Sequence, residues 1–133
     1  MTVLLDTHVW VWWLMRDSPL TRRERDALDT LAALRSVAIS AISLWEAQML
    51  HRKGRLELPL SFADGLEQAA DERMIQVVPL DSQVVLALDA LPPSFHGDPA
   101  DRLIVSTARA HRWPLATRDT SIRRSRTVTL WKS

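Results

Sequence analysis

Residues 2–15 read TVLLDTHVWVWWLM, an apolar run followed by an acidic residue and then by a longer apolar stretch. The run over residues 2–5 is typical of a short buried strand. Asp6 and Thr7 offer a helix N-cap, and a helix is predicted over residues 8–15. Because similar strand-then-helix patterns recur along the chain, we expect a parallel α/β sheet, in which helices connect neighbouring strands.

The remaining predicted elements follow the same alternation. Strands are predicted over residues 37–40, 75–80, 115–117 and 127–130, and helices over residues 21–35, 44–52, 61–73, 81–90 and 99–111. A length of 133 residues suits one domain, and no repeat or flexible linker divides it. We therefore expect a single α/β domain over residues 1–133, with a parallel sheet of about four to five strands flanked by helices.

Composition excludes several classes of protein. The chain has no cysteine, which removes disulfides, thiolate zinc sites and cysteine nucleophiles. The N-terminus lacks the basic region and cleavage pattern of a signal peptide, and no apolar run approaches the roughly 18 residues of a membrane span. The formal net charge of +1 gives no overall basic field, although a local basic patch is compatible with it. We expect a soluble, cytoplasmic protein that does not contact a membrane.

Four acidic residues stand where an apolar run meets a predicted helix start. They are Asp6, Glu46, Asp101 and Asp119. Since the carboxyl ends of parallel strands share one edge of the sheet, these residues are expected to gather there. Gathered carboxylates repel one another unless a cation lies between them, and Mg²⁺ and Mn²⁺ prefer carboxylate and water oxygens. Such ions activate water and stabilise an in-line phosphoryl displacement, so the pattern predicts metal-dependent hydrolysis of an anionic substrate.

Several of these acids also have a local, purely structural interpretation. Asp6 is an N-cap by position, and residues 43–46 match the S-x-x-E capping box. Asp98 and Asp101 fit the cap and the third position of the helix that follows them. Asp81 follows an apolar run in the same way as Asp6, so local pattern alone predicts too many sites of this kind.

Other catalytic patterns are missing from the sequence. The four histidines lack the spacing of an H-E-x-x-H zinc site, and no P-loop, G-x-S-x-G or G-x-G-x-x-G motif occurs. His8 and His96 adjoin the predicted acids and are candidates for contact with a substrate.

Three motifs together carry a resemblance to a known family. The chain contains LLDTHVWVWWL near its start, SAISLWEAQMLHRKGRLELP in its middle and HGDPADRLIVSTARAHRWPLATRD towards its end. In order and spacing, these are similar to the Asp-Thr-His, Ser-x-x-Glu, Asp-Pro-x-Asp-Arg and closing Thr-x-Asp motifs of PIN-domain ribonucleases. The chain resembles in particular the VapC-type toxins of bacterial toxin–antitoxin pairs.

This resemblance implies a set of site residues. The metal-binding and catalytic acids would be Asp6, Glu46, Asp101 and Asp119, with Asp98 as a further possible ligand beside the preferred Asp101. The hydroxyls that support these ligands would be Thr7, Ser43 and Thr117. The resemblance also implies Mg²⁺ or Mn²⁺ as cofactor, RNA as substrate, a homodimer, and inhibition by a small cognate antitoxin.

Basic residues close to the predicted acids fit a substrate that carries phosphate. Arg118, Arg123 and Arg124 surround or follow the fourth acid, and each is able to neutralise a phosphate. Arg102 is a further candidate, although it is equally placed to pair with an acid and hold the geometry of the site. A mixed charged surface would explain the same clusters.

The helix predicted over residues 8–15 is apolar around its whole circumference, which indicates burial on more than its sheet-facing side. This pattern predicts a protein partner, either a second copy of the chain or another polypeptide. The alternative is cover from the helix over residues 21–35 alone.

Taken together, the sequence favours a metal-dependent endoribonuclease that acts as the toxin of a toxin–antitoxin pair. Two alternatives stay open. One is a catalytically degenerate PIN-like module that binds RNA or a partner without cutting, and the other is a small metal-dependent phosphatase.

Overall fold

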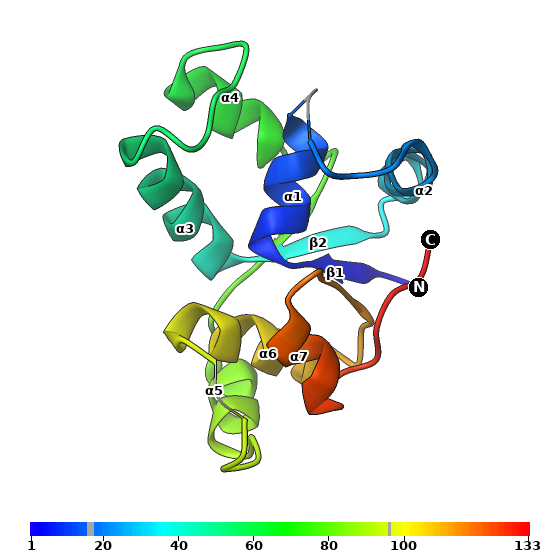
Figure 1. Ribbon diagram of the computed structural model, residues 1–133, viewed down its shortest axis with the longest axis vertical. Helices are drawn as coiled ribbons and strands as arrows, with labels where there is room; N and C mark the ends of the chain where they lie inside the picture. Colours follow the sequence, from blue (N-terminus) through cyan, green and yellow to red (C-terminus); the bar gives the residue numbers. More distant parts are fainter. Residues whose placement is uncertain (16–17, 96) are drawn as a thin grey trace.

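The computed structural model describes residues 1–15, 18–95 and 97–133, and shows strands that alternate with helices (Figure 1). The strands are β1 (Val3–Leu5), β2 (Val37–Ser40), β3 (Gln76–Val78) and β4 (Leu115–Ala116). The helices are α1 (Thr7–Leu14), α2 (Arg22–Ala33), α3 (Ala41–Arg52), α4 (Phe62–Ala69), α5 (Ser82–Asp89), α6 (Pro99–His111) and α7 (Thr120–Ser125).

The four strands form one parallel sheet in the order β3-β2-β1-β4. The central strand β1 pairs Leu4 with Ala38 of β2 on one side and with Leu115 of β4 on the other. The parallel α/β sheet predicted from the sequence is thus confirmed. The central strand β1 is apolar throughout because helices cover both faces of the sheet, whereas the edge strand β3 begins with the exposed Gln76.

The predicted strand over residues 127–130 is wrong. Only Leu130 forms a parallel bridge, to Leu115, and the backbone bonds on either side of that bridge join Leu115 to Thr129 and Trp131. Because β4 is two residues long, it offers too little edge for another strand. The C-terminal segment is nevertheless fixed to β4.

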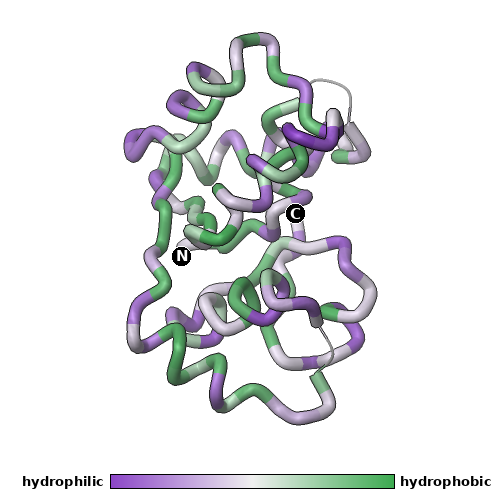
Figure 2. The backbone as a smooth tube through the Cα atoms, turned by 90° about the vertical axis from the view of Figure 1, so that its left-hand side faces the viewer, coloured by the Kyte–Doolittle hydropathy of each residue, from purple (hydrophilic) through white to green (hydrophobic). Residues whose placement is uncertain are grey.

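Two helical layers enclose the sheet. Helices α1 to α4 lie over one face and α5 to α7 over the other, and β1 and β2 lead into α1 and α3 at the same side of the sheet (Figure 1). Val3 and Leu5 of β1 belong to the core under the first layer, whereas Leu4 belongs to the core under the second. This division follows from the alternation of side chains along a strand. Hydrophobic and hydrophilic stretches are interspersed along the whole chain (Figure 2).

Helix α3 begins earlier than the sequence predicts. Ser40 is its N-cap, with the Ser40 hydroxyl accepting from the backbone N–H of Ile42 at 3.2 Å, so the helix follows β2 without a loop. The predicted capping box over residues 43–46 is therefore wrong, because Ser43 and Glu46 lie inside the helix and contact α1 instead. Helix α6, by contrast, has the predicted bounds.

The apolar circumference of α1 is covered largely by the same chain. Val9, Trp10 and Val11 are buried, and residues 12–15 are half-buried against the core that α2 and α4 share. Arg25 of α2 also donates to the carbonyl oxygens near the end of α1. The alternative of cover from residues 21–35 alone is therefore met only in part, because α4 contributes as well. None of the described helices is long and apolar enough to cross a membrane.

Candidate active site

The carboxylate of Asp6 lies at the carboxyl end of β1 and is held by donors from two elements. Asp6 is 5 % exposed and caps α1, where the backbone N–H of Thr7 donates to Oδ1 at 2.8 Å. The hydroxyl of Thr117, which follows β4, donates to Oδ2 at 2.6 Å. The backbone N–H of Asp119 donates in turn to that hydroxyl at 3.0 Å. Asp6 and Asp119 therefore share Thr117 as a common support.

A second chain of hydrogen bonds joins α1 to α3. The hydroxyl of Thr7 lies 2.5 Å from Oε1 of Glu46 and 2.7 Å from the hydroxyl of Ser43. An ionised carboxylate only accepts, so Thr7 gives its one proton to Glu46 and accepts from Ser43. The bond to Thr7 holds Glu46 at the start of α1, within electrostatic reach of Asp6. All three hydroxyls that the sequence predicted as supports thus contact the acids or each other.

The third contribution comes from the start of α6. Asp98 caps this helix and accepts from the backbone N–H of Asp101 at 2.8 Å, with Pro99 in the first turn. Gly97 lies directly behind Asp101: a Cβ added at Gly97 would lie 2.9 Å from the Cβ of Asp101 and 2.8 Å from the ring of Phe95. Sequence reasoning missed Gly97, although it is one of only three glycines in the chain.

The carboxylates of the site affect one another's pKa. Burial raises the pKa of the Asp101 carboxyl to about 7, with further contributions from nearby carboxylates, which are, in order of effect, Asp98, Asp6, Asp119 and Glu46. Burial also raises the pKa of Asp6 and of Glu46, although hydrogen bonds from Thr117 and Thr7 oppose it. The fold therefore concentrates negative charge at one edge of the sheet.

The donor set fits a hard divalent cation. It consists of carboxylate oxygens supported by hydroxyls, which suits Mg²⁺ or Mn²⁺ better than the nitrogen and sulfur donors of zinc sites. Among the described residues, no three Asp, Glu or His side chains already stand close enough to ligate one ion directly. Mutually repelling carboxylates are expected to stay apart without a counter-charge, and Mg²⁺ keeps several water ligands when it binds.

Asp81 shows what separates the gathered acids from an ordinary helix cap. It caps α5 by accepting from the backbone N–H of Val84 at 3.1 Å, and it is exposed. It does not appear among the carboxylates that raise the pKa of Asp101. A position directly after a strand is therefore not enough to place an acid in the site. Asp81 follows β3, which lies at the opposite edge of the sheet from β4.

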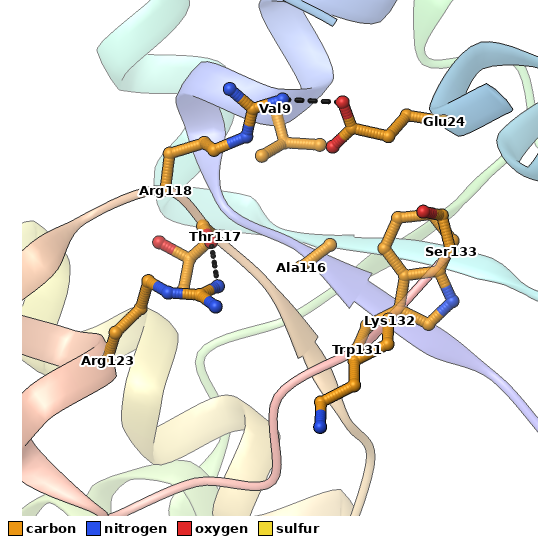
Figure 3. Close-up of a pocket in the computed structure, with 9 residues that line it drawn as sticks. All are labelled: Val9, Glu24, Ala116, Thr117, Arg118, Arg123, Trp131, Lys132 and Ser133. Atoms are coloured by element: carbon orange, nitrogen blue, oxygen red, sulfur yellow. Dashed lines mark hydrogen bonds and ion pairs between the residues drawn. The ribbon is translucent and has the colours of Figure 1, made fainter. Parts of the chain in front are cut away.

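The predicted basic residues occupy different positions. Arg118 donates to Glu24 of α2 at 2.5 Å and lies 5.8 Å from the ring centroid of Trp12. Arg123 donates to the carbonyl of Thr117 at 3.0 Å, and both arginines face a common pocket (Figure 3). Arg124, on the same short helix, is exposed and does not line this pocket.

Arg102 does not pair with an acid. Its guanidinium donates to the backbone carbonyl of Phe95 at 3.3 Å, and no ion pair of Arg102 occurs within the described part of the chain. The alternative in which Arg102 pairs with a site carboxylate is thus not seen, because the side chain turns back to the loop before α6. Its role in binding substrate stays a prediction. His8 is exposed, with its ring 5.9 Å from that of Trp12, and His96 lies outside the described residues.

The fold and the gathered carboxylates together indicate a nuclease-like α/β protein, and comparison with known proteins gives its family. The sequence matches the PIN domain family over residues 3–127, and the chain belongs to that family. It is 38 % identical over 133 residues to Ribonuclease VapC22 of Mycobacterium tuberculosis, a match that covers 98 % of both sequences.

Solved structures share the fold at lower identity. VapBC2 from Rickettsia felis, bound to a DNA fragment from its promoter, has a TM-score of 0.73 at 20 % identity, covering 98 % of each chain. FitAB bound to the IR36 DNA fragment has a TM-score of 0.72 at 24 % identity, covering 98 % of this chain and 94 % of the other. The resemblance to PIN-domain proteins seen in the sequence motifs is confirmed.

Proposed function

We propose that the chain is a metal-dependent endoribonuclease that acts as the toxin of a toxin–antitoxin pair and hydrolyses RNA phosphodiester bonds. The observation that carries this proposal is the linked set of carboxylates at one edge of the sheet, held by hydroxyls from α1, α3 and the end of β4. The 38 % identical relative is named a ribonuclease, which supports RNA as the substrate.

Asp6, Glu46 and Asp101 would hold Mg²⁺ or Mn²⁺, and Asp119 would add a ligand or orient water. When bound, the cation supplies Lewis-acid activation of water and charge stabilisation for an in-line displacement at phosphorus. The chain's own residues do the positioning. Thr117 and the backbone of Thr7 fix both oxygens of Asp6.

Positive groups at the same edge would receive the phosphate. The N-termini of α1 and α6, capped by Asp6 and Asp98, present the positive end of the helix dipole at this edge. Arg123 adds a formal positive charge next to Thr117. A phosphodiester drawn to this edge would lie beside the carboxylates, which is the arrangement that hydrolysis needs.

Isosteric removal of single charges tests this proposal. We expect Asp6→Asn and Asp101→Asn to abolish Mg²⁺-dependent cleavage of single-stranded RNA, since even residues that merely support a metal ligand are worth about 10- to 100-fold. The matched control is Asp81→Asn, which changes an equally strand-terminal helix cap outside the acid set and should cleave at the wild-type rate. Undiminished cleavage by either site variant would overturn the assignment.

The same assay separates the alternatives. A purified wild-type protein that binds RNA without cutting it, with Mg²⁺ or Mn²⁺ present, would favour the degenerate binding module. Hydrolysis of phosphate monoesters in preference to RNA would favour the phosphatase.

The proposed partners follow from the family. A small cognate antitoxin would inhibit the enzyme, and the protein would act in the cytoplasm as a homodimer. Exposed apolar side chains on α5, Val85 at 51 % and Leu86 at 62 %, offer surface for such contacts. Light scattering on the purified chain tests the dimer.

A further inference from the structure

A pocket of about 300 Å³ lies beside the carboxylates, between α1, α2, β4 and the C-terminal segment (Figure 3). Thr117 belongs to both places, because its hydroxyl holds Asp6 while its backbone carbonyl accepts from Arg123 at the pocket wall. Ligand sites span about 300 to 1,000 Å³, so this volume suits one small unit of a ligand. Whatever occupies the pocket is a direct neighbour of the proposed reaction centre.

Arg123 is a cation available at the pocket wall. It is exposed, and no carboxylate of the described residues lies within ion-pair distance of it. One of its five N–H donors bonds the Thr117 carbonyl, which leaves most of the guanidinium free for an anion. Arg118 is different, because Glu24 already neutralises it. Lys132 also lines the pocket, at the side opposite Arg118 (Figure 3).

Trp131 gives the pocket a flat aromatic surface that is held in place. Its backbone N–H donates to the carbonyl of Leu115 at 2.9 Å, and its half-buried side chain packs on the core under the α1–α4 layer. An indole fixed in this way loses little conformational entropy when a planar group stacks on it. Aromatic side chains beside cations are the usual platform for single-stranded nucleic acids.

We propose that this pocket is a subsite for one nucleotide of the RNA, next to the bond that is cut, in which Arg123 binds the phosphate and Trp131 stacks on the base. This subsite rests on the proposed ribonuclease function. In this arrangement the RNA strand passes from the carboxylates into the pocket beside Thr117, the residue that belongs to both.

Glu24 favours a nucleotide over an acidic peptide in this pocket. Its carboxylate forms part of the wall and is held there by Arg118 and by the backbone N–H of Thr21. A ligand carboxylate would meet that negative charge at close range. A nucleotide carries its charge on the phosphate alone, and base edges present N–H donors that a glutamate accepts.

Binding without cleavage isolates the subsite. The probe is a fluorescein-labelled octauridylate or octaadenylate, titrated in EDTA by anisotropy into the Asp101→Asn protein, so that no RNA is cut. In this background Trp131→Leu keeps apolar bulk but removes the stacking face, and we expect affinity to fall about 5- to 150-fold. Trp131→Phe keeps an aromatic ring and should lose less than Trp131→Leu.

Arg123→Gln tests the phosphate contact through its salt dependence. Losing one phosphate contact should lower the slope of log affinity against log salt by about 0.7. The matched control is Arg109→Gln, because Arg109 is exposed and also bonds a backbone carbonyl, that of Thr127 at 3.1 Å, but lies at the far end of α6. That control should leave the slope unchanged.

Three outcomes would overturn the subsite. They are wild-type affinity in Trp131→Leu with its fold intact, equal slopes for the Arg123 and Arg109 variants, and tighter binding of a hexaglutamate peptide than of RNA through the same two residues. Cleavage by the wild-type protein with Mg²⁺ is scored separately. If it cuts RNA but these variants bind normally, only the subsite fails; if it cuts no RNA, the proposed function fails whatever the binding result.

Discussion

The hydroxyl of Thr117 donates a 2.6 Å hydrogen bond to Asp6 across 111 positions of the chain. This bond ties the ends of β4 and β1 together at the edge where the carboxylates gather. It also satisfies a buried carboxylate oxygen, and it opposes the rise in the pKa of Asp6 that burial causes.

Replacing Thr117 by Val keeps the shape of the side chain but removes this donor. The buried oxygen of Asp6 is then unsatisfied, so we expect a loss of about 1–3 kcal/mol in the free energy of unfolding. Affinity for Mn²⁺ should fall about 10- to 100-fold, as is usual when a ligand loses its support. Urea unfolding and calorimetric titration measure the two effects. Thr117→Ser keeps the hydroxyl and serves as control; equal behaviour of Val and Ser would contradict the prediction.

Gly97→Ala should displace the Asp101 side chain from its place in the site. The added Cβ would lie 2.9 Å from the Cβ of Asp101, which is too close for real atoms, so Asp101 or the Phe95 ring must move. We expect weaker Mn²⁺ binding and slower RNA cleavage with helical content kept, checked by titration, cleavage rate and circular dichroism. At Gly54, which has φ +70° and no atom within 4 Å of an added Cβ, Asn tolerates the backbone and should leave both functions intact. A Gly97→Ala protein with normal Mn²⁺ affinity would argue against tight placement of Asp101.

The cation-free protein should become more stable on mild acidification. Folding raises the pKa of Asp101 from 3.8 to about 7, so the folded state binds this proton more tightly than the unfolded state. The resulting stabilisation is complete below the unfolded value and is lost as pH rises through about 7. We therefore expect Tm in EDTA to be higher at pH 5.5 than at pH 8. Asp101→Asn should flatten this dependence, and a Tm profile that is the same for both proteins would refute the assignment of the shift.

A divalent cation should stabilise the fold at neutral pH, because it offsets the repulsion among the gathered carboxylates. A ligand that binds only the folded state at 100 times its Kd adds about 2.7 kcal/mol. Thermal unfolding with increasing Mn²⁺ measures this as a rise in Tm for the wild-type protein. Asp101→Asn should show little rise, whereas Asp81→Asn should match the wild type. A rise that survives in Asp101→Asn would place the cation elsewhere.

The sequence predicts the fold best where local signals agree with tertiary structure. β1 and β2 are buried on both faces and apolar except for Ser40. Helix α6 has a cap, a proline in its first turn and a left-handed residue at its end. The predicted capping box over residues 43–46 is wrong because Ser43 and Glu46 contact Thr7 instead, which lies 36 and 39 positions away from them in the chain. No local pattern distinguishes these two uses.

Part of the site was likewise predictable from the sequence and part was not. The gathering of the acids at one sheet edge was predictable, because strand ends meet there in any parallel sheet. The contribution of Trp131 and Glu24 to a pocket beside them was not, since it depends on how the C-terminal segment and α2 pack around β4. Which acids ligate a cation stays a prediction that the variants above decide.

The shortness of β4 has a consequence for how the protein would lose activity. This strand of two residues is one of the two edge strands of the sheet, bonded to β1 on one side and to the backbone of Thr129 and Trp131 on the other. Edge strands that are held by few backbone hydrogen bonds open more readily than the central strands. On warming, detachment of the C-terminal segment would let Thr117 withdraw from Asp6 while the helical layers persist. The protein would then lose activity through local opening at a temperature below that of global unfolding. The few backbone hydrogen bonds between β4 and residues 129–131 would set the highest temperature at which it works.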